Sequence, residues 1–195
     1  MNMRNEDRDY EAVQKALDLL GKLEGDYIHF DLNEYLTSPY GLILEKNHPA
    51  YARNAQMAKN INLELHEGLT LSDYKDIAEE RLRNDLKRLK NDLSEDTWDN
   101  LSIEAKAVLL DFKYHTDVTY SEFAQKAIQY EADPTRSNLL ELVSESYRYF
   151  RGNRTDGLDN RTVSVLYEHG YIDSVQEAIS LGLVKANRYA NAPME

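Results

Sequence analysis

Apolar residues recur at helical spacing along most of this chain. The first stripe lies between residues 9 and 24, and its members are Val13, Leu17, Leu20 and Leu23. Residues at intervals of three and four share one face of a helix, so this segment predicts an amphipathic helix. We expect the helix to end at Gly25, because glycine readily takes the left-handed backbone that terminates helices.

A second and longer stripe begins after Ser72, which suits the cap of a helix. Its members are Tyr74, Ile77, Ala78, Leu82, Leu86, Leu89 and Leu93. The pattern predicts a helix over residues 72–95, with a length of about 30 Å at 1.5 Å per residue. A helix of that length in a chain of 195 residues is expected to join two lobes.

Between these stripes, residues 26–48 depart from the helical pattern. Aromatic and β-branched residues gather here, and Ser38-Pro39 and Gly41 are turn signals. We expect short strands or irregular loop, and this is the only β region that the sequence predicts. Pro49 suits the first turn of the next helix, which we expect over residues 51–65.

The rest of the chain reads as shorter helices that begin near Ser102, Ser121 and Pro134, with two more over residues 158–168 and 172–181. The predicted fold class is therefore mainly α, of the α+β kind. We expect a single domain, 1–195. Its parts are an N-terminal helix (1–22), a small β or loop region (26–48), an inter-lobe helix (72–95) and a helical lobe (100–185).

Charge narrows the partners. The chain carries 35 acidic and 23 basic side chains, a formal net charge of −12. Phosphate backbones and anionic membrane surfaces repel such a protein, so we expect neither nucleic acid nor membrane as a partner. Residues 1–10 are charged and contain no apolar run, which predicts synthesis in the cytoplasm without a signal peptide or transmembrane segment.

Cofactor chemistry also has little support in the sequence. The chain has no cysteine, which excludes disulfides and thiolate ligands, and its five histidines are scattered without ligand spacing. No glycine-rich phosphate loop occurs. We therefore expect no metal and no cofactor.

Four segments, in order, resemble the phage-type lysozymes of the T-even kind, glycoside hydrolase family 24. They are Leu23-Glu24-Gly25, Gly68-Leu69-Thr70-Leu71-Ser72-Asp73, Leu101-Ser102 with residues 107–114, and Gly157-Leu158-Asp159-Asn160-Arg161 with Leu166-Tyr167. The resemblance runs from about Glu24 to Tyr167. It implies a peptidoglycan glycan strand as the substrate and Glu24 as the general acid of a muramidase.

The partner of that acid is altered. An inverting glycosidase needs a second group that activates water on the opposite side of the sugar. Counted from Glu24, the family's Asp and Thr positions fall on Asn33 and Pro39; aligned on Tyr35, Thr37 and His48, they fall on Thr37 and Ile43. The remaining candidates for the second group are Asp31, a water held by Thr37, and the nearby carboxylates Asp26 and Glu34.

Two hypotheses follow from the resemblance. In the first, the chain is a muramidase in which Glu24 is the acid and Asp31 or a water on Thr37 replaces the missing partner. In the second, it is a catalytically inactive lysozyme-like component of a phage, with a structural, binding or inhibitory role and a protein partner. The high negative charge favours the second, because bacterial walls are anionic.

Overall fold

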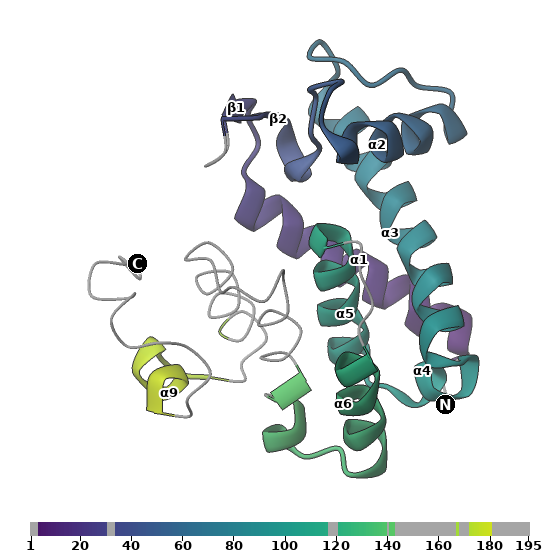
Figure 1. The fold of residues 1–195 in the computed structure, drawn as a ribbon, viewed down its shortest axis with the longest axis vertical. Helices are drawn as coiled ribbons and strands as arrows, with labels where there is room; N and C mark the ends of the chain where they lie inside the picture. Colours follow the sequence, from purple (N-terminus) through teal and green to yellow (C-terminus); the bar gives the residue numbers. More distant parts are fainter. Residues whose placement is uncertain are drawn as a thin grey trace. The chain divides into compact units, whose positions relative to one another are not determined.

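The computed structural model describes residues 4–30, 34–116, 121–139, 141–142, 167 and 172–180. The described part is mainly helical and contains one sheet of two short strands, which confirms the predicted fold class (Figure 1). The chain divides into two compact units, Met1–Arg88 and Leu89–Glu195. The boundary between them falls inside helix α3 (Leu71–Leu93).

The first unit opens with α1 (Asn5–Glu24). The helix begins before the expected Asp9, and the acidic Glu6 and Asp7 stand in its first turn, where the helix dipole favours negative charge. Its predicted apolar face is buried, and the buried side chains are Asp9, Ala12, Val13, Ala16, Leu17, Leu19 and Leu20. Gly25 follows with a φ of 77°, as the sequence predicted for the end of the helix.

The predicted β region contains β1 (His29–Phe30) and β2 (Leu36–Thr37), which pair antiparallel with His29 opposite Thr37. A single bridge joins Thr37 to Ile43, so β2 has a neighbour on each side. Between them the chain makes a short 3₁₀ turn, η1 (Pro39–Gly41), which packs on α1.

Helix α2 (Pro49–Asn60) starts at the proline, and the imidazole of His48 caps it by accepting a hydrogen bond from the amide of Ala50 at 3.0 Å. The helix ends at Asn60, before the expected Leu65. The reason is a left-handed residue, Asn62, with a φ of 61°, which turns the chain so that the amide of Leu63 donates to the carbonyl of Ala58.

The part of α3 in the first unit packs against α2 through polar as well as apolar contacts. Arg81 Nη1 donates to Asn54 Oδ1 at 2.8 Å, and both side chains are buried. Nearer the surface, Asn60 Nδ2 donates to Glu80 Oε1 at 3.0 Å. These bonds, together with buried Met57, Ile77 and Leu82, form the α2–α3 part of the core.

The second unit contains α4 (Glu95–Asn100), α5 (Ile103–Thr116), α6 (Ser121–Ala132) and α9 (Val175–Ser180). Helix α4 was not predicted; its one large apolar side chain, Trp98, is fully buried. Helix α5 is buried on every side from Ala105 to Tyr114, including the charged Lys106, Asp111 and Lys113. The helix predicted over residues 158–168 and the fourth lysozyme-like segment lie outside the described residues, apart from Tyr167.

Candidate functional site

Glu24 is the last residue of α1, at the junction between the helix and the β region. Its side chain is half-buried. The carboxyl group lies against Gly41 of the η1 turn: a Cβ built on Gly41 would stand 3.1 Å from both Glu24 Cδ and Oε2. The absence of a side chain at position 41 is therefore what allows Glu24 to lie there.

The η1 turn takes an uncommon backbone to make this contact. Tyr40 has a φ of 62° and a ψ of 18°, and Gly41 has a φ of 68°, so two successive residues are left-handed. Glycine adopts this conformation without penalty, whereas a bulky residue such as tyrosine does so only where the surroundings hold it. Strained residues of this kind gather at functional sites.

The ring of Tyr40 lies on α1. A Cβ built on Gly21 would stand 3.1 Å from Tyr40 Cε1, so the ring occupies the space that a side chain on the helix would fill. Gly21 precedes Glu24 by less than one turn of the helix. The pairs Gly21–Tyr40 and Glu24–Gly41 thus dock the η1 turn on the end of α1 at two adjacent points.

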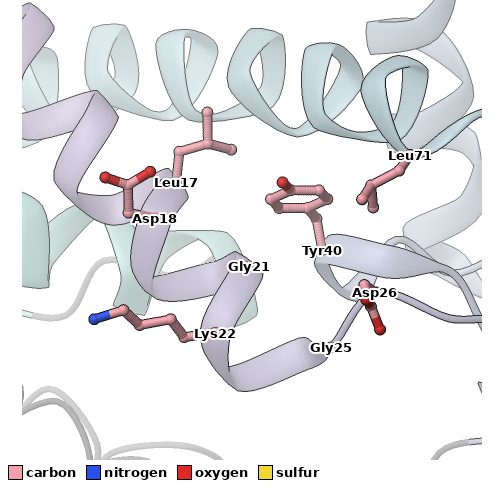
Figure 2. A pocket seen from close by; sticks show the side chains of 8 residues that line it. All are labelled: Leu17, Asp18, Gly21, Lys22, Gly25, Asp26, Tyr40 and Leu71. Atoms are coloured by element: carbon pink, nitrogen blue, oxygen red, sulfur yellow. The ribbon is translucent and has the colours of Figure 1, made fainter.

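An open pocket of about 460 Å³ lies beside this contact, and Figure 2 shows the residues that line it. Tyr40 reaches from the η1 turn into the space between Leu17 of α1 and Leu71 at the start of α3. The remaining lining residues are Asp18, Gly21, Lys22, Gly25 and Asp26. The pocket therefore combines apolar walls with two exposed carboxylates and one exposed ammonium group.

The other two predicted site residues do not join Glu24 in the described geometry. Thr37 lies in β2 with only 3% of its surface exposed, and its hydroxyl donates to the carbonyl of Tyr35 at 3.1 Å. Asp31 lies outside the described residues. Of the nearby carboxylates, Asp26 lines the pocket, whereas Glu34 is an exposed residue with a φ of 63°.

Sequence reasoning missed the role of the two glycines and Asp18. Gly21 stands inside a helical stripe and was treated as part of an ordinary helix. The signal was available in retrospect: a glycine inside a helix that otherwise favours better helix formers often marks a close approach of another element.

Among the described residues, no group of three or more His, Cys, Asp or Glu side chains is arranged to hold a metal ion. None of the described helices has the length and apolar character that a bilayer span requires. Comparison of the chain with protein-family models, with curated proteins and with solved structures gave no match.

Proposed function

We propose that the chain is a lysozyme-like protein directed at peptidoglycan, a muramidase-type glycan hydrolase with Glu24 as the general acid. The observation that carries the proposal is the contact of the Glu24 carboxyl group with Gly41, next to an open pocket. A general acid must be held in place and partly shielded from water, so that it keeps its proton until the leaving oxygen takes it. Glu24 is half-buried and fixed between a helix end and a turn.

Asp26 is the candidate for the second carboxylate. It is exposed and lines the pocket, so a water molecule and a sugar both have access to it. In an inverting glycosidase the second carboxylate works as a base on water, and it must be accessible and ionised. In this proposal Asp26 takes that role, in place of the water on Thr37 that the sequence had suggested. Asp31 stays a candidate that the described residues do not test.

The second hypothesis, an inactive lysozyme-like component that binds without turnover, has its own support. Thr37 is buried, and its hydroxyl is engaged with its own strand. A buried hydroxyl that already donates to a carbonyl is poorly suited to hold a water molecule against a developing sugar cation. The second hypothesis holds if Asp26 cannot replace it.

Clearing of chloroform-treated Gram-negative cells, with release of reducing sugar from purified peptidoglycan, separates the two hypotheses. We expect clearing by the unsubstituted chain and a fall of at least about a hundredfold in Glu24→Gln, because the acid contributes that much to such reactions. Asp26→Asn is expected to be similarly impaired. Glu67→Gln is the matched control, since Glu67 is an exposed carboxylate of the same unit outside the pocket.

Each other outcome has a clear reading. No clearing or sugar release by the unsubstituted chain between about pH 5 and 8, the range where such acids operate, rejects the enzyme. Sedimentation with insoluble peptidoglycan would then support the inactive binding component. Full activity of Glu24→Gln would remove Glu24 from the mechanism.

A further inference from the structure

Two tyrosine rings cover two glycines on the last turns of α1. Tyr40 Cε1 would lie 3.1 Å from a Cβ on Gly21, and Tyr27 Cε1 would lie 3.3 Å from a Cβ on Gly25. The two glycines are separated by four residues, the spacing that puts side chains on one face of a helix. The rings therefore stand over neighbouring places on the same helix surface, and both glycines line the pocket.

Both rings remain available to a ligand. Tyr27 is 65% exposed, although aromatic rings of that size are usually well buried. Tyr40 is only half-buried and lines the pocket. Leu71, at the same pocket, exposes 47% of its surface. The pocket and its border thus present aromatic and aliphatic surface to solvent that the core of the unit does not use.

We propose that Tyr40 and Tyr27, with Gly21 and Gly25 between them and α1, form a sugar subsite that takes an N-acetylhexosamine ring. This inference rests on the proposed glycan-directed function and names residues that bind the glycan beside Glu24. One face of a β-linked pyranose carries axial C–H bonds and is apolar, and it packs on an aromatic ring as other apolar groups do.

The polar groups of the pocket match the rest of such a sugar. Asp18 and Asp26 are hydrogen-bond acceptors, which sugar hydroxyls and an acetamido N–H group supply with donors. The acetamido methyl group has an apolar counterpart in the exposed Leu71. A volume of about 460 Å³ is within the range of small-molecule pockets.

Charge argues against a phosphorylated ligand at this place. Two carboxylates and one ammonium group line the pocket, and the whole chain has a net charge of −12. A phosphate group would meet repulsion, whereas a neutral amino-sugar derivative loses nothing. The subsite therefore favours N-acetylated, uncharged sugar rings over nucleotides and sugar phosphates.

Calorimetric titration of the full chain with tri-N-acetylchitotriose tests the subsite, and the Glu24→Gln background prevents turnover during the measurement. The key variant is Gly21→Ala. Alanine is the better helix former, so the helix itself does not suffer, but the added Cβ pushes the Tyr40 ring from its place. Gly68→Ala is the matched control, since its Cβ would meet the imidazole of His66 at 3.2 Å, outside the pocket.

We expect saturable binding of the trisaccharide, weakened about tenfold by Gly21→Ala and by Tyr27→Ala, the loss of one good stacking contact. Tyr40→Phe keeps the ring and is expected to change the affinity by no more than about threefold, and Gly68→Ala likewise. Melting temperatures, followed by circular dichroism, verify that the variants are folded.

The subsite is overturned if the chain fails to bind the trisaccharide at millimolar concentration, or if folded Gly21→Ala binds it as tightly as the parent. These failures differ from failure of the proposed enzyme. Cell clearing that survives in Gly21→Ala alongside unchanged binding removes the subsite and leaves the hydrolase. Trisaccharide binding without any clearing removes hydrolysis and leaves the subsite.

Discussion

The carboxyl group of Glu24 rests against the α-carbon of Gly41, so closely that any side chain at position 41 would meet it. Gly41 belongs to a turn that also holds Tyr40, and α1 carries both contacts of that turn. The position of the one carboxylate that the lysozyme resemblance selects thus depends on a residue without a side chain in another element.

Substitution of Gly41 by alanine is therefore expected to damage both stability and the site. The φ of 68° strains any residue with a Cβ, and the new methyl group displaces Glu24. We expect a loss of roughly 1–3 kcal/mol in the free energy of unfolding, measured by urea denaturation, together with reduced cell clearing. An unfolding free energy equal to that of the parent would contradict the described turn.

The buried bond between Arg81 and Asn54 is expected to contribute more to stability than bonds at the surface. Asn54→Ala removes the acceptor at 2.8 Å from Arg81 Nη1 in a place without solvent. We expect a cost of about 2–3 kcal/mol, because the bond involves a charged group and leaves a buried donor. Gln56→Ala, which removes an exposed bond to Asn60 on the same helix, is the control, with a cost within about 0.5 kcal/mol. Equal effects of the two substitutions would argue against the buried bond.

Asp73 is expected to make the stability of the first unit sensitive to acid. The hydroxyl of Thr70 donates to its carboxylate at 2.6 Å and the amide of Thr70 at 2.9 Å, and these bonds lower the pKa of Asp73 below its ordinary value of 3.8. A carboxyl whose pKa is lower in the folded state adds stability above its unfolded pKa and loses it as the pH falls through the folded pKa.

The difference in unfolding free energy between the parent and Asp73→Asn should therefore be constant above about pH 5 and shrink toward zero in stronger acid. Asp76→Asn, an exposed neighbour on the same helix, provides the comparison. A difference that stays constant down to about pH 2 would show that the Thr70 bonds do not favour the ionised form.

Tyr74 is expected to act at the alkaline end. Burial raises the pKa of its hydroxyl above 10.0, and the hydroxyl donates to the carbonyl of His66 at 2.8 Å. A group whose pKa is raised on folding adds stability below its unfolded pKa, and this contribution disappears as the pH rises through the folded pKa. Tyr74→Phe should cost about 1 kcal/mol at neutral pH through the lost hydrogen bond.

In denaturation series from neutral to strongly alkaline pH, the parent is expected to lose stability above its ordinary tyrosine pKa of 10.0 faster than Tyr74→Phe does. Parallel curves for the two proteins would mean that Tyr74 ionises as readily in the folded chain as in the unfolded one.

Hydrophobic periodicity located the long helices because their buried faces repeat along the sequence. The stripe from Val13 to Leu23 became α1, and the stripe after Ser72 became α3. Periodicity failed where a single backbone angle decides the outcome, as at Asn62, which ends α2 early. It also failed at α4, which is too short for a repeating pattern and buries one large side chain, Trp98.

The candidate site was only partly accessible to sequence reasoning. Glu24 was expected at the end of a helix facing the β region, and α1 does end there. The pocket beside it depends on Tyr40 meeting Gly21, a contact between distant parts of the sequence that no local pattern encodes. The orientation of Thr37 depends in turn on strand register, since a shift of one residue exchanges the two faces of a strand. The resemblance to phage lysozymes stays a prediction.

The left-handed backbone of Tyr40 sets folding and use against each other. Glycine or asparagine at this position would relieve the strain, so selection of variant libraries for thermal stability alone should enrich those two residues. Selection for glycan capture should instead retain an aromatic ring at position 40 and accept the lower melting temperature. The residue that survives each kind of selection would therefore report what the turn is for.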